Sequence, residues 1–263
     1  MKEVFLATAK CPVLISIPHA GTHIPEPIRS RFKQRALELP DTDWYIDQVW
    51  DIAVEHGAGL LIARNSRYVV DLNRPPDDQP LYTREGTGLI PLTTFEGQDI
   101  YLPGAEPGAA DRKERLDRHW RPYHRILRNE LDRLVKAHGY AILIDAHSIR
   151  SNLPRLFEGR LDALNLGSHD GKSAARDLIV LAKSQFDRWE NYRCVLDGRF
   201  KGGYITRHYG RPDKNVHALQ LEMAQRVYMQ ENPPRLLPAP LANVRVRISE
   251  FLETLLTWRS VDE

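Results

Sequence analysis

The chain has 263 residues, and its 37 lysines and arginines nearly balance its 35 aspartates and glutamates. This length is enough to bury a substantial core, and we expect one α/β domain over 1–263. The charge balance excludes an overall field that would favour nucleic acid or an anionic membrane surface. The longest apolar runs, such as "YAILIDA", fall far short of the ~20 residues that a membrane-spanning helix needs.

The two cysteines and the N-terminal segment indicate the compartment. Cys11 and Cys194 are too few for a disulfide framework, and they lack the close CxxC spacing of a structural zinc site. The N-terminal "MKEVFLATAKCP" has Glu3 and Lys10 on either side of a short apolar patch, which makes a poor secretory signal. We therefore expect a cytoplasmic protein.

In chain order, the first expected element is a buried strand over 13–17, "VLISI". A helix is expected from "PDTDWYID" onward, where Asp41 or Thr42 can cap the free N–H groups of its first turn. Asp43 and Asp47 are four residues apart, so they would share one face of this helix.

The next part of the chain predicts a hairpin and then a long loop. "GLLIARN" (59–65) and "RYVVDLNR" (67–74) are expected to be two strands joined at Asn65–Ser66. Residues 74–111 are rich in proline and glycine and show no sustained periodicity. Because such long loops in compact domains are often functional covers, and because aromatic and leucine side chains are interspersed here, we expect an ordered cover near the site.

The second half of the chain alternates helices and strands. "DRKERLDRHWRPYHRILRNELDRLVKAHG" predicts a long amphipathic helix with a kink at Pro122, and "YAILIDAHS" is typical of a strand buried on both faces. The later expected elements are a helix over 173–188, strands over 191–199 and 216–223, and a helix over 242–258. This alternation predicts an open α/β sheet with helices on both faces.

Polar side chains stand at the ends of these strands, where open α/β sheets bind their ligands. His19 follows the first strand, Asp145 and His147 close the central strand on one face, and Glu222 closes a later strand. Two imidazoles, a carboxylate ligand and a further carboxylate are what a mononuclear catalytic zinc site requires. A single strand-end histidine is more often structural, so it is the joint pattern that supports a metal site.

Arginine side chains supply a second part of the pattern. Asn73 and Arg74 end the run "VVDLNRPP", and Arg207 stands in the glycine-bracketed "GGYITRHYG", which we expect to be a loop. The planar guanidinium binds carboxylates through two parallel hydrogen bonds. The simpler alternatives are that Arg74 pairs with Asp71 or Asp77 and that Arg207 lies on the surface, and for Arg207 alone the second is favoured.

Six motifs in a fixed order lie within residues 15–229: "SIPHAGTHIP", "DTDWYID", "SRYVVDLNRPPDD", "ILIDAHSI", "GGYITRHYG" and "HALQLEMAQRVYM". This ordered set resembles the N-formylglutamate amidohydrolase (deformylase) family. The resemblance implies a mixed open sheet similar to that of zinc carboxypeptidases and aspartoacylases, with one catalytic Zn²⁺. It also implies hydrolysis of N-formyl-L-glutamate to formate and L-glutamate, a step of bacterial histidine degradation.

The same resemblance assigns roles to individual residues. It makes His19 and His147 metal ligands and Glu222 the general base. Asn73 and Arg74 look like the Asn-Arg pair by which the related carboxypeptidases hold a substrate carboxylate.

The carboxylate ligand is where the sequence departs from the carboxypeptidases. Those enzymes use a His-x-x-Glu pair, but Thr22 stands three residues after His19. We therefore expect the third ligand from Asp43 ahead of Asp47, with His23 as a further candidate. The plainer interpretation of both aspartates is that they stabilise the first turn of a helix against its dipole.

Four residues have expected supporting roles. Arg74 and Arg207 would clamp the two carboxylates of the substrate. Asp145 would orient His147 from behind, or else cap a nearby loop. Gly21 would let the backbone pass close to the metal.

The sequence leaves two other functions as alternatives and disfavours a third. The same zinc chemistry could act on another N-acyl amino acid or on a peptide-like amide. A non-catalytic protein could bind a dicarboxylate, although it would be expected to lack a ligand or the base. Nucleic acid is disfavoured because the basic residues of 111–136 are interleaved with acids, so the expected partner is a small molecule and neither nucleic acid nor a membrane.

Overall fold

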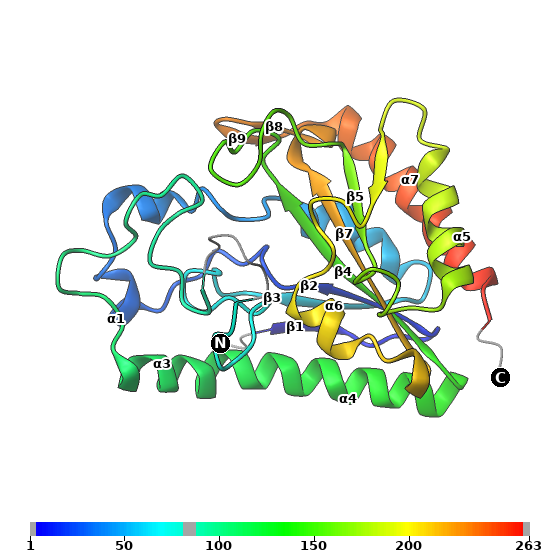
Figure 1. The fold of residues 1–263 in the computed structure, drawn as a ribbon, viewed down its shortest axis with the longest axis horizontal. Helices are drawn as coiled ribbons and strands as arrows, with labels where there is room; N and C mark the ends of the chain where they lie inside the picture. The colour runs from blue at the N-terminus through cyan, green and yellow to red at the C-terminus, as the bar shows by residue number, and fades with distance from the viewer. Residues whose placement is uncertain (1–3, 81–87, 260–263) are drawn as a thin grey trace.

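The computed structural model describes residues 4–80 and 88–259, and a seven-stranded sheet forms its centre (Figure 1). The strand order is β1-β3-β2-β4-β7-β5-β6, and β8 and β9 form a separate hairpin. The strands are β1 Val4–Ala7, β2 Val13–Ile17, β3 Gly59–Ala63, β4 Ala141–Ile149, β5 Leu164–Gly167, β6 Cys194–Leu196, β7 Val216–Ala224, β8 Met229–Glu231 and β9 Pro234–Leu236.

The sheet is mixed. Its central strands β3, β2, β4 and β7 are parallel, whereas β1 is antiparallel to β3 and β5 is antiparallel to β7. In this register Ser16 of β2 lies beside Asp145 of β4, and His147 lies beside Glu222 of β7. The carboxyl ends of three neighbouring strands therefore meet at one edge of the sheet, as expected for ligand binding in this class of fold.

Helices cover both faces of the sheet because successive side chains of each strand point to opposite faces. Val13 and Ile15 of β2 pack with Ile142 of β4 in the core on the face that α2, α5 and α7 cover. Leu14 and Leu143 pack on the other face, which α4 covers. The predicted mixed α/β sheet with helices on both faces is confirmed.

The helices differ greatly in length. In Figure 1, α4 runs below the sheet and α5 and α7 lie beside each other at its right. The helices are α1 Glu26–Arg29, α2 Ile46–Trp50, α3 Ala109–Arg115, α4 Arg121–His138, α5 Arg176–Asp187, α6 Tyr204–Tyr209 and α7 Pro238–Thr257, with short 3-10 turns at Gln34–Glu38, Asp51–Val54, Pro212–Lys214 and Gln225–Val227.

The expected second strand over 67–74 is wrong, and so is the hairpin that would have joined it to β3, because this segment is irregular. Side chains of the long helix replace the hydrogen bonds that a neighbouring strand would supply. His124 Nε2 lies 2.9 Å from the carbonyl oxygen of Leu72, and Trp120 Nε1 donates to that of Arg74 at 3.0 Å. These two carbonyl groups of the segment are thus satisfied without a strand ladder.

The expected helix cap at Asp41 or Thr42 is also wrong. The helix α2 starts only after Tyr45, whose φ of 61° is left-handed and breaks the helical path. Asp41 instead accepts hydrogen bonds from Tyr68 Oη at 2.7 Å and from the backbone N–H of Phe95 at 2.8 Å. The Asp41 carboxylate therefore makes tertiary contacts with residues distant in sequence, and it does not cap a helix as the sequence predicted.

Three further expectations change in detail. The helix that contains Pro122 has a π-turn at Leu116–Trp120 just before the proline. The expected loop over 74–111 ends earlier because α3 has begun, and its residues 81–87 lie outside the described residues. Arg207 lies within α6 and not in a loop.

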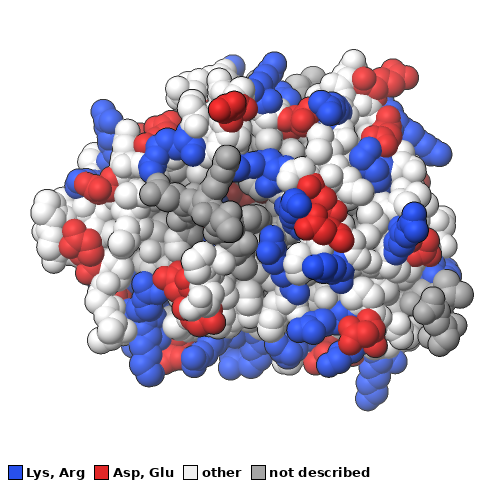
Figure 2. Space-filling model, viewed as in Figure 1, with Lys and Arg blue, Asp and Glu red and all other residues white. Residues whose placement is uncertain are grey.

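The strands β1, β5, β8 and β9 were not predicted. Each has only three or four residues, too few for a recognisable alternation. Figure 2 shows basic and acidic side chains interleaved over the viewed face. Within the described ranges, no helix has both the length and the apolar character needed to cross a membrane.

Candidate metal centre

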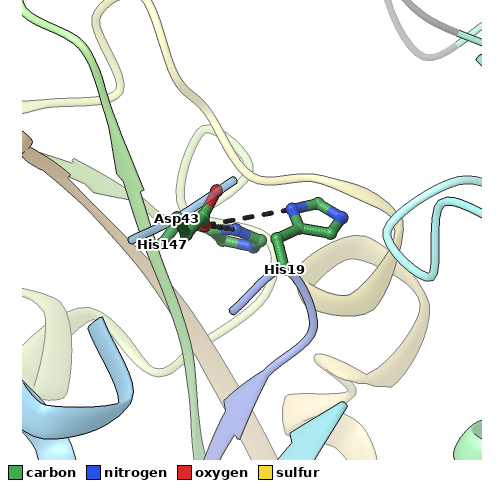
Figure 3. A group of neighbouring side chains, drawn as sticks. All are labelled: His19, Asp43 and His147. Atoms are coloured by element: carbon green, nitrogen blue, oxygen red, sulfur yellow. Dashed lines mark hydrogen bonds and ion pairs between the residues drawn. The ribbon is translucent and has the colours of Figure 1, made fainter. Parts of the chain in front are cut away.

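His19 and His147 lie close together because the strands that precede and carry them, β2 and β4, are neighbours in the sheet. Their ring centroids are 4.9 Å apart, and both side chains are buried. One possible ligand atom from each of His19, Asp43 and His147 lies within 4.8 Å of the other two. In Figure 3, dashed lines join Asp43 to both imidazoles. We call these three residues the donor cluster.

Asp43 reaches the cluster from the segment that precedes α2. Its Oδ2 accepts a hydrogen bond from the backbone N–H of Ser148 at 3.0 Å, and it lies 3.0 Å from His147 Nδ1 and 3.9 Å from His19 Nδ1. The expectation that Asp43 and Asp47 share a helical face is wrong, because only Asp47 is in the helix. Asp47 is not in the donor cluster.

The outer nitrogen of each imidazole contacts another buried carboxylate. His19 Nε2 lies 2.7 Å from Asp71 Oδ1, and His147 Nε2 lies 3.2 Å from Asp145 Oδ1. Among the described residues, this Asp145 oxygen is buried without a hydrogen-bond partner. A histidine that ligates a metal through Nδ1 carries its proton on Nε2, and a carboxylate there fixes the ring and raises its basicity. Asp71 and Asp145 are placed to do this.

The electrostatics of the cluster favour positive charge. Burial lowers the pKa of His147, but Asp145 and Asp43 outweigh it and hold that pKa well above its usual value. Burial raises the pKa of Asp71, but His19 and Arg67 outweigh it and hold that pKa well below its usual value. Several buried carboxylates thus surround a few cationic groups, and a bound cation would reduce the cost of burying them.

The donor set fits zinc by its chemistry. Two imidazole nitrogens and one carboxylate oxygen are a common set of three protein ligands in catalytic zinc sites, and they leave one position open. The outer nitrogens already face carboxylates, so the Nδ1 atoms can serve as ligands. His23, the further candidate, is exposed and lies outside the cluster.

Glu222 is buried at the end of β7, beside His147 in the sheet register. Its carboxylate receives no hydrogen bond from the described residues. Burial raises the pKa of this carboxyl group to about 8, and the charge of His147 opposes that rise. A buried carboxylate with a raised pKa and no fixed partner has the properties of a general base or acid.

Asn73 is placed at the site, but its side chain is already engaged by protein groups. Its Nδ2 donates to Asp145 Oδ2 at 3.0 Å and lies 2.8 Å from His147 Nε2, while its Oδ1 accepts from the N–H of Ile205 at 2.7 Å. A Cβ on Gly203 would lie 2.4 Å from Asn73 Nδ2, so only glycine fits there. Asn73 therefore joins β4 to the start of α6.

Arg74 and Arg207 are both half-buried. Arg74 Nη1 donates to the carbonyl oxygen of Asn73 at 3.0 Å, and the charge of Arg74 acts on the nearby Asp71. Arg207 Nε donates to the carbonyl oxygen of Gly202 at 2.7 Å. Neither residue is a purely exposed surface arginine.

Arg67 and Asp71 are site residues that the sequence analysis did not identify. Arg67 Nη2 donates to Asp71 Oδ2 at 2.7 Å, and Arg67 Nη1 lies 3.9 Å from Asp43 Oδ1. Both residues lie in the segment that was expected to be a strand. The available signal was their opposite charge at a spacing of four, because such a pair comes close only where the chain is not extended.

Glycine is needed at position 21 for a different reason from the expected one. A Cβ there would lie 2.3 Å from the carbonyl oxygen of Asn65, so the close approach is between the exits of β2 and β3. The backbone N–H of His23 donates to the carbonyl oxygen of Arg64 at 3.0 Å in the same contact. Gly21 thus fixes the direction in which the chain leaves His19.

Comparisons with known proteins agree with this geometry. The N-formylglutamate amidohydrolase family model matches residues 11–229. The chain is 47% identical over 250 residues to an N-formylglutamate deformylase of Pseudomonas putida and 49% identical over 250 residues to one of Pseudomonas aeruginosa. Each match covers 95% of this chain and 94% of the relative.

Two solved structures share the fold. An N-formylglutamate amidohydrolase from Ralstonia eutropha JMP134 superposes with a TM-score of 0.87 at 23% identity, covering 98% of both chains. A protein from Agrobacterium tumefaciens superposes with a TM-score of 0.76 at 19% identity, covering 98% of this chain and 96% of that one. Together with the extent of the family match, these findings show that the chain belongs to the N-formylglutamate amidohydrolase family.

Proposed function

We propose that this protein is a zinc-dependent amidohydrolase that converts N-formyl-L-glutamate and water into formate and L-glutamate. The observation that carries the proposal is the donor cluster with the buried, unpaired carboxylate of Glu222 beside it. The names of the two Pseudomonas relatives support the substrate. A place in histidine degradation and a cytoplasmic location stay predictions.

His19, Asp43 and His147 would hold the metal through Nδ1, a carboxylate oxygen and Nδ1. Bound zinc would supply Lewis acidity, which lowers the pKa of a water molecule towards ~7 and polarises a carbonyl group. Asp71 would keep the His19 imidazole oriented through its Nε2, and Asp145 together with Asn73 would do so for His147. The backbone N–H of Ser148 donates a hydrogen bond to the carboxylate of Asp43 and helps to hold it in place.

Glu222 would move the proton in the reaction. Its carboxylate takes a proton from the attacking water as the oxygen bonds to the formyl carbon. It then returns that proton to the glutamate nitrogen as the C–N bond breaks, so formate and free L-glutamate leave with all atoms accounted for. Proton transfer of this kind contributes on the order of 100- to 10,000-fold in rate.

The substrate carries two carboxylates and a very small acyl group. Arg74 is expected to bind one carboxylate and Arg207 to approach the other, and both belong to segments attached to the donor cluster through Asn73. Asn73 itself would act by holding these segments in place, because its amide is already engaged by protein groups. The described part of the 74–111 segment, whose Phe95 ring centroid lies 4.7 Å from the guanidinium of Arg67, is the proposed cover.

The test is formate release by the zinc-loaded protein from N-formyl-L-glutamate, with N-acetyl-L-glutamate and N-formyl-L-leucine as comparisons. We expect efficient turnover of N-formyl-L-glutamate alone. Preferred turnover of either comparison substrate would assign the same chemistry to another N-acyl amino acid. Binding of glutamate without turnover of any substrate would favour a non-catalytic dicarboxylate-binding protein.

A further inference from the structure

Arg150 directly follows β4 and stands three residues after His147. Its Nη1 donates to Glu96 Oε1 at 2.7 Å, and its Nη2 lies 4.0 Å from Asp41 Oδ1. The Nε and Nη2 atoms are buried, and neither has a hydrogen-bond partner among the described residues. The Nη1 side of this guanidinium is therefore hydrogen-bonded, whereas the Nε and Nη2 side has, among the described residues, only the longer ion pair of Nη2 with Asp41.

Nε and Nη2 form one edge of the guanidinium, and in the described part of the chain neither atom takes part in a hydrogen bond. Nε–H and one Nη2–H point the same way and together make two parallel hydrogen bonds to a carboxylate. Buried donors without a partner are costly. This edge of Arg150 therefore has the geometry and the unmet hydrogen bonds of a carboxylate site.

Side chains of alternating charge lie between Arg150 and the donor cluster. Asp41 feels the charges of both Arg150 and Arg67, and Arg67 Nη1 lies 3.9 Å from Asp43 Oδ1. The Oδ1 atom of Asp41 is itself buried without a hydrogen-bond partner in the described part of the chain. Arg150 is thus on the same side of the molecule as the donor cluster, at the carboxyl end of the strand that carries His147.

Arg67 is less suited to a second carboxylate. Its Nη2 already donates to Asp71, and its guanidinium lies 4.7 Å from the ring centroid of Phe95. Only its Nε is unpaired among the described residues. Arg150, in contrast, offers both atoms of one edge.

We propose that the Nε and Nη2 edge of Arg150 binds the side-chain carboxylate of the formylated amino acid. Arg150 thereby makes the enzyme prefer an acidic N-formyl amino acid over its uncharged analogue. This inference rests on the proposed function, and it adds a specificity residue to the carboxylate clamps Arg74 and Arg207.

The test compares Arg150→Met with the unaltered enzyme on N-formyl-L-glutamate and on N-formyl-L-glutamine, which has the same shape without the charge. We expect kcat/KM for N-formyl-L-glutamate to fall about 100-fold, mainly through KM, since a charged partner loses its buried counter-charge. For N-formyl-L-glutamine we expect a change of less than about 3-fold, since no charged contact is lost.

Two further variants separate substrate binding from a structural role. Glu96→Gln removes the carboxylate on Nη1 and leaves the open edge intact, so we expect it to keep the preference for the acidic substrate. Arg150→Lys keeps the charge without the fork, and we expect a smaller loss that is again confined to N-formyl-L-glutamate. It also serves as the test if Arg150→Met does not fold.

Equal losses on both substrates, or the same loss in Glu96→Gln, would overturn the inference and leave Arg150 as a support for the 88–100 segment. Failure of the proposed function would give a different experimental result. In that case the unaltered zinc-loaded enzyme would itself release no formate from N-formyl-L-glutamate.

Discussion

Glu222 is the buried residue to which the proposed mechanism assigns the proton transfer. It lies beside His147 in the sheet, it is 7% exposed, and its carboxylate has no hydrogen bond from the described residues. Removing the charge while keeping the shape isolates its part in proton transfer. The donor cluster does not include Glu222, so this substitution leaves the three proposed metal ligands unchanged.

We expect Glu222→Gln to retain zinc and to lower kcat by about 100- to 10,000-fold, since the amide cannot accept the proton. Zinc content and formate release measured on the same sample check this. Glu190→Gln, on an exposed residue, is the matched control. A fully active Glu222→Gln enzyme would refute the assigned base.

We expect Asp71 to act through His19 and not on the substrate. Its Oδ1 lies 2.7 Å from His19 Nε2, and its Oδ2 accepts from Arg67. We expect Asp71→Asn to weaken zinc affinity by about 10- to 100-fold, because the ring loses the carboxylate that orients it. Competition with a chromogenic chelator measures the affinity.

The control for this substitution is Asp99→Asn, at an exposed carboxylate that pairs with Lys33. It should leave zinc affinity unaltered. Equal zinc affinities of Asp71→Asn and the unaltered protein would show that Asp71 serves Arg67 alone.

Among individual site residues, the sequence was informative about those whose side chains lie at strand ends. His19, His147 and Glu222 could be grouped because parallel strands bring their carboxyl ends together, and the structure does bring the two histidines together with Asp43. Their catalytic and ligand roles stay predictions. Asp71 and Arg67 could not be grouped, since their positions depend on an irregular segment whose path is set by tertiary contacts.

The irregular segment over 66–74 and the long helix depend on each other. Arg115 Nη1 donates to the carbonyl oxygen of Val69 at 3.2 Å, and His124 Nε2 lies 2.9 Å from that of Leu72. His124 is buried and also stacks on Trp120 with ring centroids 3.7 Å apart. The helix thereby positions the chain that delivers Asp71, Asn73 and Arg74 to the site.

This contact predicts a pH dependence of stability. Burial, with smaller effects of His208 and Arg128, lowers the pKa of His124 to about 3. Below its unfolded pKa of about 6.5 the unfolded chain binds a proton that the native state does not bind. The free energy of unfolding therefore falls as the pH drops from about 6.5 towards about 3, by up to about 1.4 kcal/mol per pH unit.

Urea unfolding of the metal-free protein between pH 7 and pH 5 measures this slope. We expect His124→Gln to have a shallower slope than the unaltered protein, and His138→Gln, at an exposed histidine, controls for the substitution itself. Identical slopes for His124→Gln and the unaltered protein would contradict the prediction.

Among the elements, those with a long and regular pattern were predictable. The strands β2, β4 and β7 and the helices α4, α5 and α7 all appear near their expected positions. The error over 67–74 arose because "RYVVDL" has strand-like composition, while side chains from α3 and α4 satisfy its backbone. Propensity could not reveal partners that lie more than 40 residues away.

For the whole molecule, the sheet explains why residues so distant in sequence form one site. Each face of the sheet carries its own buried core, and the edge where β2, β4 and β7 end receives the polar side chains. A single domain over 1–263 remains the prediction from its length. The family match covers residues 11–229, which include every residue of the proposed site.

The most direct test of the central claim is formate release from N-formyl-L-glutamate by metal-stripped protein during titration with zinc. We expect no release without metal and full activity at one equivalent of zinc per chain, because the donor cluster offers one set of three ligands. A triple substitution of His19, Asp43 and His147 by alanine should bind no zinc at this site. Undiminished turnover by the metal-stripped protein would contradict the account.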